Sequence, residues 1–200
     1  MKPIILCMDM ESVLTPEIWE EVAKRTWVNE LLLTTKDIAD YNKLMNHRLE
    51  HLNKNWIGLS VIEDVVSTIE PLPWAADFLS RARSKMQVIV LSDTFIEIAK
   101  PLVTKLWNPT IFSHNILIDN DKIVDYKLRI SDQKTKSVEK FKELNFTTIA
   151  VGDSLNDTGM LKMADYWYFF NPWEKARNEF PDIPVINSFE ELKLLIDKII

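Results

Sequence analysis

Residues 3–12, PIILCMDMES, decide the fold and raise the functional question. The apolar run from Ile4 to Met8 predicts a strand that is covered on both faces, as in a parallel sheet. Two acids, Asp9 and Glu11, follow this run with one residue between them. Carboxylates at the mouth of a buried strand must be solvated, paired or bound to a cation. The stretch therefore predicts a buried strand with a charged site at its carboxyl end.

The composition narrows the class of protein. The chain has 200 residues, of which 46% are hydrophobic and 27% charged, enough for one domain with a sizeable insertion. A formal net charge of −6 argues against a general nucleic-acid binder, because phosphate contacts need a basic surface. No signal peptide or membrane-spanning stretch is expected, and the single cysteine fits a reducing compartment. We therefore expect a cytoplasmic enzyme without membrane or nucleic-acid partners.

The glycines exclude two common phosphate-binding motifs. The sequence contains only Gly58, Gly152 and Gly159. Neither the dinucleotide-binding pattern G-x-G-x-x-G nor the P-loop pattern G-x-x-x-x-G-K-[ST] can be built from these three positions.

Short apolar runs alternate with helical patterns along most of the chain. Further strands are predicted over residues 87–91, 148–151, 166–170 and 184–186. Helices are predicted over residues 74–84, 95–106, 132–144, 157–164 and 188–199. Residues 116–129 predict a hairpin that turns at Asn120-Asp121. The alternation predicts an α/β fold with a doubly wound, mostly parallel sheet.

Residues 15–72 interrupt this alternation because they contain no strand-like run. A helix is predicted to begin at Pro16, a second to span about 37–55, and a third to begin near Ser60, whose side chain could cap it. The segment therefore predicts a small all-helical cap inserted after the first strand.

The chain is accordingly divided into a core of residues 1–14 and 73–200 and a cap of residues 15–72. Ligands of open α/β sheets bind beyond the carboxyl ends of the strands. A helical cap that begins next to the Asp9 loop would therefore close over whatever the acids bind.

Polar side chains follow three predicted strands at the point where each strand ends. In chain order they are Asp9 and Glu11, then Ser92 and Asp93, then Asp153, Asn156 and Asp157. Because these ends meet at one edge of a parallel sheet, we expect the side chains to lie together. Magnesium usually takes one or two carboxylates, water and a substrate phosphate, so Asp9 and Asp153 are predicted Mg²⁺ ligands.

The same acids predict a chemistry. An ionised Asp9 can attack phosphorus to form an aspartyl-phosphate. Glu11 would then protonate the leaving alkoxide and later take a proton from water.

A positive group is also needed to neutralise the transferring phosphoryl oxygens. On the helix after the hairpin, which Ser131 or Asp132 would cap, Lys134 lies within about 40° of Val138 and Phe141 on the buried face. Lys134 is therefore the predicted positive group, with a lysine that extends over the core surface as the alternative.

These motifs resemble those of the haloacid dehalogenase superfamily of phosphotransferases. DMESVL (9–14) looks like its nucleophile loop, LSDT (91–94) its phosphate-binding serine, Lys134 its lysine, and GDSLNDTGML (152–161) its acidic motif. The resemblance covers essentially the whole chain and implies an HAD-like Rossmannoid core. The usual first motif of the superfamily is D-x-D, whereas this chain has D-x-E followed by Ser12.

That departure, together with Pro16-Glu17, LMNHRLEHL (44–52) and VIVLSDTF (88–95), resembles a small subfamily of phosphoserine phosphatases. Its members can also pass the phosphoryl group from phosphoserine to homoserine, and the subfamily suggests a homodimer. The resemblance implies that Asp9 is the nucleophile and Glu11 the acid/base. It also implies that Glu17 and Arg48 hold the ammonium and carboxylate of the substrate, and that four residues contact phosphate or substrate: Ser92, Asp93, Lys134 and Asn156. Mg²⁺ would lie on Asp9, the backbone carbonyl of Glu11 and Asp153, and Asp157 would support Mg²⁺ or Lys134.

Other functions stay open on the sequence alone. They are a phosphatase for another small phosphometabolite, a receiver-like signalling domain with a phospho-accepting aspartate, and a catalytically inactive binding module. The inserted segment counts against a receiver, and the complete set of reactive residues counts against an inactive module. Without the resemblance, Arg48 would be expected to be a solvated cap residue.

Three further features are interpreted as structural. His47 and His51, four residues apart, could chelate a metal, but no third ligand has a suitable spacing, so a solvated pair is expected. Cys7 is expected to be a small buried thiol. The seven scattered tryptophans are expected to pack in the core and cap, with Trp19 or Trp27 as candidates for a subunit contact.

Overall fold

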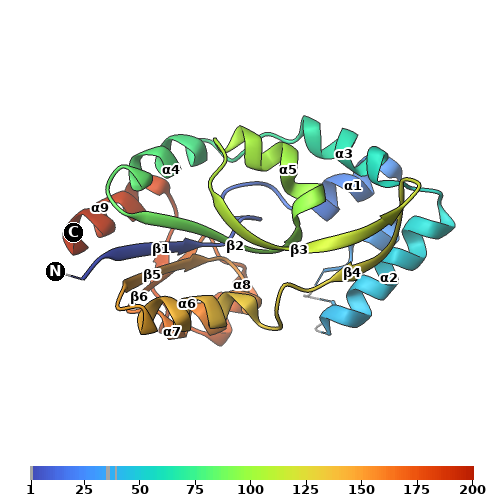
Figure 1. Ribbon diagram of the computed structural model, residues 1–200. Coiled ribbons are helices and arrows are strands. Elements are labelled where there is room, and N and C mark those ends of the chain that lie inside the picture. The colour runs from blue at the N-terminus through green and yellow to red at the C-terminus, as the bar shows by residue number, and fades with distance from the viewer. Residues whose placement is uncertain (1, 35–36, 39) are drawn as a thin grey trace.

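The protein is an α/β structure in which helices cover both faces of one sheet (Figure 1). The computed structural model describes residues 2–34, 37–38 and 40–200. In this part of the chain the sheet has seven strands in the order β4-β3-β2-β1-β5-β6-β7. Every neighbouring pair is parallel except the β3–β4 hairpin. The predicted doubly wound, mostly parallel sheet is confirmed.

The first strand lies at the centre of the sheet. It pairs with β2 on one side and β5 on the other, so its carboxyl end meets theirs. The strands are β1 (Ile4–Met8), β2 (Gln87–Phe95), β3 (Thr110–Asp119), β4 (Lys122–Lys127), β5 (Thr147–Gly152), β6 (Tyr166–Phe170) and β7 (Val185–Ile186).

Each face of the sheet buries its own hydrophobic cluster. Leu6 and Met8 of β1 belong to the cluster on one face, whereas Ile5 and Cys7 belong to the other. This alternation follows from the two-residue period of a strand. Cys7 is a buried free thiol, as expected.

The helices divide between the two faces (Figure 1). One face carries α1 (Ile18–Thr26), α3 (Leu59–Thr68), α4 (Ala75–Arg83), α5 (Ile96–Lys105) and α9 (Phe189–Ile199). The opposite face carries α6 (Gln133–Glu143), α7 (Thr158–Met163) and α8 (Glu174–Glu179). The helix α2 (Tyr41–Lys54) lies beside β4, and two short 3₁₀ turns are η1 (Asn29–Leu32) and η2 (Leu155–Asp157). In the described part of the chain, no helix is both long and apolar enough to cross a bilayer.

The segment 15–72 forms α1, η1, α2 and α3, and α3 is fastened to the core. The ammonium of Lys105 in α5 donates to the backbone carbonyls of Ser67 and Ile69, and it pairs with Glu70 at 2.6 Å. Apolar side chains of the segment also share one cluster with those of the core.

The N-termini of α2 and α3, two helices of residues 15–72, differ from prediction. The predicted helix over 37–55 begins at Tyr41, because the side chain of Asp40 accepts hydrogen bonds from the backbone N–H groups of Asn42 and Lys43. Asp37 and Ile38 are not helical, and position 39 lies outside the described residues.

Ser60 does not cap α3; the helix has Gly58 at its N-cap position. Asp121, at the hairpin turn, accepts hydrogen bonds from the Ser60 N–H and hydroxyl, both at 2.7 Å. The sequence could not show this, because Asp121 follows Ser60 by 61 positions in the chain. The turn at Asn120-Asp121 is as predicted, and both residues have positive φ, as a two-residue hairpin turn requires.

Two further expectations need correction, and one short helix was not expected. Neither Ser131 nor Asp132 caps α6: Asp132 holds the N-cap position with a left-handed backbone and makes no side-chain capping bond. The strand predicted over 87–91 continues to Phe95, so Ser92 and Asp93 lie within the strand, near its carboxyl end, and not in a following loop. The short α8 was not predicted, because its six residues are too few for a periodic pattern.

The expectation that the tryptophans pack inside is wrong for five of the seven: Trp27, Trp56, Trp74, Trp107 and Trp167 are exposed. The first four have positive φ at or beside helix ends. The chain changes direction at these positions, and the indoles project outward. Trp19, in contrast, is buried.

The contact between α3 and the hairpin predicts a coupled stability effect. A Cβ at position 58 would lie 2.1 Å from Asp121 Oδ2, so Gly58→Ala should displace the capping carboxylate. We expect a loss of about 1–3 kcal/mol, as for other overpacked sites, measured by urea unfolding. In an Asp121→Ala background the same substitution should cost clearly less. An equal cost in both backgrounds would show that the clash is not the cause.

Candidate active site

A buried lysine lies at the centre of the acids. Lys134 Nζ is 2.9 Å from Asp9 Oδ1 and 2.7 Å from Asp157 Oδ1, and it is 3.6 Å from Asp93 Oδ2. Only 3% of its side chain is exposed. Burial opposes its charge, but Asp157, Asp9 and Asp93 outweigh that effect and raise the pKa of Lys134 well above its ordinary value. The lysine is therefore a permanent cation, and it points inward as the helical pattern predicted.

Asp157 holds this lysine in place. Its Oδ1 binds Lys134, and its Oδ2 accepts hydrogen bonds from the N–H of Asp153 and from the N–H and hydroxyl of Ser154, each at 3.0 Å. Gly152 makes room for it, since a Cβ there would come within 2.4 Å of Asp157. Protein donors therefore already use both carboxylate oxygens of Asp157.

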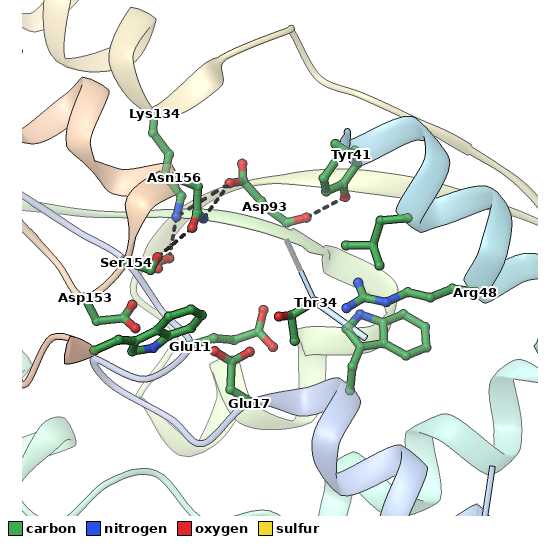
Figure 2. A pocket seen from close by; sticks show the side chains of 14 residues that line it. Glu11, Glu17, Thr34, Tyr41, Arg48, Asp93, Lys134, Asp153, Ser154 and Asn156 are labelled. Atoms are coloured by element: carbon green, nitrogen blue, oxygen red, sulfur yellow. Dashed lines mark hydrogen bonds and ion pairs between the residues drawn. The ribbon is translucent and has the colours of Figure 1, made fainter. Parts of the chain in front are cut away.

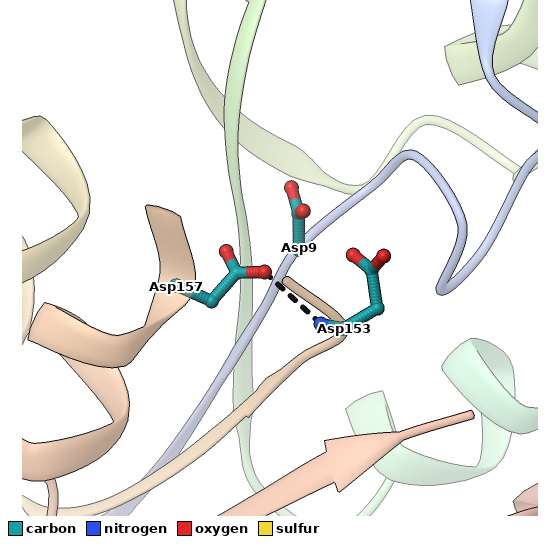
Figure 3. Close-up of side chains that lie close together, drawn as sticks. All are labelled: Asp9, Asp153 and Asp157. Atoms are coloured by element: carbon teal, nitrogen blue, oxygen red, sulfur yellow. Dashed lines mark hydrogen bonds between the residues drawn. The ribbon is translucent and has the colours of Figure 1, made fainter. Parts of the chain in front are cut away.

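The donor set fits a divalent cation. Carboxylate oxygens of Asp9, Asp153 and Asp157 lie within 4.8 Å of one another (Figure 3). Burial raises the pKa of Asp9 well above its ordinary range; Asp157 and Asp153 add to this effect, and Lys134 opposes it. One lysine cannot balance three buried carboxylates, whereas Mg²⁺ takes oxygen ligands of this kind. Asp9 and Asp153 would hold it.

Asp9 is positioned by the end of β1. Its N–H donates to the Val151 carbonyl of β5 at 2.9 Å, and its Oδ1 accepts a hydrogen bond from the Met10 N–H at 2.7 Å. The central strand thus presents this carboxylate to Lys134 and Asp153 from a fixed backbone.

Glu11 lies beyond a tight turn. Ser12 has a φ of 60°, and its hydroxyl donates to Glu17 Oε1 at 2.9 Å, while Glu11 Oε1 accepts from the Ile18 N–H at 2.8 Å. Burial, with a contribution from the charge of Glu17, raises the pKa of Glu11 to about 7, even though the Ile18 N–H, Arg48 and Lys134 oppose the shift. Glu11 can therefore give and take a proton near neutral pH.

Arg48 is not the solvated residue expected from the pattern alone. It is 7% exposed, its Nη2 donates to the Leu33 carbonyl at 3.0 Å, and its guanidinium lies 4.6 Å from the centre of the Trp19 ring. Its Nε has no hydrogen-bond partner among the described residues. Burial lowers the pKa of Arg48 to about 10, so it stays charged.

Asp93 lies between two groups of donors. Its Oδ2 faces Lys134 and accepts from Asn156 Nδ2 at 3.4 Å, and its Oδ1 is 3.7 Å from His114 Nε2. Burial favours its neutral form, but Lys134, His114 and Asn156 together hold the pKa of Asp93 well below its usual range.

These groups surround a small polar cavity of about 70 Å³ (Figure 2). Eight of the ten predicted site residues line it: Asp9, Glu11, Glu17, Arg48, Asp93, Lys134, Asp153 and Asn156. Figure 2 shows Arg48 reaching in from α2, on the opposite side from Asp153. Of the other two, Asp157 does not line the cavity and binds Lys134. Ser92 is buried, and its hydroxyl accepts a hydrogen bond from the Thr94 N–H.

The sequence analysis missed several residues of the site. Tyr41, at the start of α2, donates to the Asp93 carbonyl at 2.8 Å and so connects α2 to the end of β2. His114, in β3, accepts a hydrogen bond from the Arg129 N–H at Nδ1, which leaves Nε2 to face Asp93. Trp173 lines the cavity. His114 precedes the hairpin predicted over residues 116–129, so the sequence pattern did not indicate its burial, and the other two residues gave no signal either.

Comparisons with known proteins agree with this geometry. A sequence profile described as haloacid dehalogenase-like hydrolase matches residues 7–165. The chain belongs to this family. It is therefore an enzyme of the hydrolase class, and the resemblance found in its motifs is confirmed.

Two relatives are 43% identical over 190 residues, which is 94% of this chain. A phosphoserine phosphatase of Pseudomonas syringae is covered over 80% of its length, and the phosphoserine phosphatase ThrH of Pseudomonas aeruginosa over 93%. A crystal structure of a phosphoserine phosphatase in its apo form superposes with a TM-score of 0.76 at 22% identity and covers 98% of each chain. The last likeness shows the shared fold.

The raised pKa of Glu11 predicts a pH-dependent effect on stability. Between pH 4.5 and 7 the folded protein holds a proton that the unfolded chain releases, so this group contributes stability at low pH that is lost as the pH rises. Glu11→Gln should therefore stabilise the metal-free protein at pH 8, by at most about 3 kcal/mol, and much less at pH 5. The measurement is urea unfolding at both pH values. An equal effect at both would contradict the raised pKa.

Proposed function

We propose that the enzyme is a Mg²⁺-dependent phosphoserine phosphatase that works through an aspartyl-phosphate. The observation that carries the proposal is the buried Arg48 in the same cavity as Asp9. A phosphatase for simple phosphate esters needs the acids and Lys134, but it has no use for a desolvated guanidinium. An amino-acid phosphate does, because its carboxylate matches the planar donors of arginine.

The substrate would lie across the cavity. Its phosphate would face Lys134 and Asn156, and its carboxylate would pair with the guanidinium of Arg48. The ammonium group would meet Glu17, whose Oε1 is already turned by the Ser12 hydroxyl. Phosphoserine is a small phosphate ester that carries these three groups, and both curated relatives are phosphoserine phosphatases by name.

The reaction follows from the positions of the acids. The Asp9 carboxylate attacks phosphorus, the ester P–O bond breaks, and Glu11 gives its proton to the serine oxygen. Glu11 then takes a proton from water, which attacks the aspartyl-phosphate to release phosphate and restore Asp9. A pKa of about 7 suits both proton transfers. Lys134 and the Asn156 amide stabilise charge on the phosphoryl oxygens.

Magnesium on Asp9 and Asp153 would neutralise charge on the phosphate and keep Asp9 ionised. We take residues 15–72 as the cap that excludes water around the ester. We also propose a cytoplasmic location, which its single buried thiol supports.

Phosphate release from L-phosphoserine in the presence of Mg²⁺ tests the proposal. Arg48→Met should raise KM for phosphoserine by about 10- to 100-fold, because a charge-assisted contact is worth about 1.5–3 kcal/mol. Its KM for p-nitrophenyl phosphate, which lacks the amino-acid end, should change little. Asp9→Asn should abolish turnover of both substrates and retain the fold.

Two results would count against these assignments. Equal losses on both substrates in Arg48→Met would make the arginine structural, and the substrate would then be another phosphometabolite. Retained turnover in Asp9→Asn would exclude the covalent step.

A second outcome of the same intermediate is transfer to homoserine. Homoserine has the ammonium and carboxylate of serine and one more methylene, so Arg48 and Glu17 can hold it in the same way. Its hydroxyl would replace water as the group that Glu11 deprotonates. The active-site geometry is compatible with both acceptors.

Adding homoserine to the phosphoserine reaction decides between the acceptors. We expect phosphohomoserine to form, with less free phosphate released per phosphoserine consumed, because the two acceptors compete for one intermediate. The products can be quantified by ³¹P NMR. If no phosphohomoserine forms at any homoserine concentration, water is the only acceptor.

A further inference from the structure

The buried imidazole of His114 faces the site without lining its cavity. Only 4% of this residue is exposed, and its Nε2 is 3.7 Å from Asp93 Oδ1. Asp93 does line the cavity, together with Lys134 and Asn156. An effect of His114 on a bound phosphate would therefore pass through the Asp93 carboxylate.

The contacts of the ring determine which of its nitrogens carries the proton. His114 Nδ1 accepts a hydrogen bond from the Arg129 N–H at 3.1 Å, so this nitrogen is unprotonated. In a neutral imidazole the proton then lies on Nε2, the nitrogen that faces Asp93. The rings of Tyr41 and Phe95 lie beside the imidazole, with centroids 5.9 and 6.3 Å from its own, and restrict its rotation. His114 thus presents a fixed N–H dipole to the carboxylate.

The two oxygens of Asp93 face different groups. Its Oδ1 faces His114 and accepts a hydrogen bond from Gln133 Nε2 at 3.5 Å. Its Oδ2 faces Lys134 Nζ at 3.6 Å and accepts from Asn156 Nδ2 at 3.4 Å, and Figure 2 shows both contacts. The donors at Oδ1 therefore hold the carboxylate in the rotation that places Oδ2 against the lysine and the amide.

The same donors oppose an electrostatic repulsion. Asp93 brings a negative charge to a cavity that is proposed to take a phosphate, and like charges in a site of this kind repel one another. Neither His114 nor Gln133 is among the residues that line the cavity. Their N–H groups therefore attract the Asp93 carboxylate toward the side away from the substrate.

We propose that His114 is a positioning residue for phosphoryl transfer, which holds Asp93 so that its carboxylate directs the Lys134 ammonium and the Asn156 amide at the phosphoryl oxygens. The inference rests on the phosphoryl transfer proposed above, but it does not depend on which phosphate ester is the substrate. His114 itself touches no substrate atom. Its removal should therefore affect all phosphate esters alike, whereas removal of Arg48 should affect only phosphoserine.

Two substitutions separate the Nε2 donor from the rest of the imidazole. His114→Asn keeps an acceptor near the place of Nδ1 for the Arg129 N–H, but it lacks the group that faces Asp93. It should lower kcat about tenfold on both phosphoserine and p-nitrophenyl phosphate, the smaller effect expected for a hydrogen bond to a charged group. His114→Gln can place its amide nitrogen near the position of Nε2 and should recover most of the lost rate. Circular dichroism checks the fold of both variants.

A double-mutant cycle tests whether the histidine acts through the carboxylate. In an Asp93→Asn background, His114→Asn should change kcat by less than about twofold, because the charge that the histidine holds is absent. A histidine with only a structural role would cost the same factor in both backgrounds. Equal factors would overturn the proposal, and so would a wild-type kcat in His114→Asn.

Binding of inorganic phosphate at saturating Mg²⁺ gives a measurement that needs no turnover. Isothermal titration calorimetry should show phosphate binding several-fold weaker in His114→Asn than in the wild type. The matched control comes from the other two histidines of the chain, His47 and His51, which are partly buried and not solvated as expected, and which do not line the cavity. His47→Asn should bind phosphate as the wild type does.

The two measurements distinguish failure of this inference from failure of the proposed function. Wild-type protein that turns over neither ester would contradict the proposed function. In that case an unchanged phosphate affinity in His114→Asn would overturn the positioning role as well, whereas a weakened affinity would support it.

Discussion

The attraction between Lys134 and the carboxylates around it organises the rest of the site. Desolvation would remove the charge of an isolated buried lysine, so this one can exist only where acids surround it. The same acids would repel one another without it. Both carboxylate oxygens of Asp157 accept hydrogen bonds from Lys134 and from backbone N–H groups. The carboxylates of Asp9 and Asp153 are therefore the better candidates for a cation. The excess negative charge that remains is what makes the site suited to a divalent cation.

Much of this arrangement could be predicted from the sequence. The apolar run before Asp9 and the acids after three strands specify a parallel sheet with one charged edge, because parallel strands bring their carboxyl ends together. The inward direction of Lys134 followed from helix periodicity. The identification of Arg48 depended on resemblance, since its helix neighbours suggested only a packed element.

The rest depended on contacts between distant segments. Asp121 caps α3 from the hairpin, and the hydroxyl of Tyr41 in α2 donates to the Asp93 carbonyl. Local patterns carry no information on such pairs, because each partner is an ordinary polar residue in its own segment. The prediction that the tryptophans are buried was wrong for a related reason. Side-chain type predicted burial, but at four of the five exposed positions the backbone at a helix end directs the indole outward.

The hairpin contact has a consequence for how the chain folds. The tip of the β3–β4 hairpin completes the first turn of α3, and the ammonium of Lys105 closes the last one. Both ends of a helix from the inserted segment therefore depend on residues that follow it by tens of positions in the chain. The fold of the inserted segment is therefore coupled to this edge of the sheet, and the boundaries at residues 15 and 72 separate two regions of sequence that share these contacts. We therefore expect the two regions to melt in a single transition, and a different inserted segment would lose the contacts that this hairpin tip supplies.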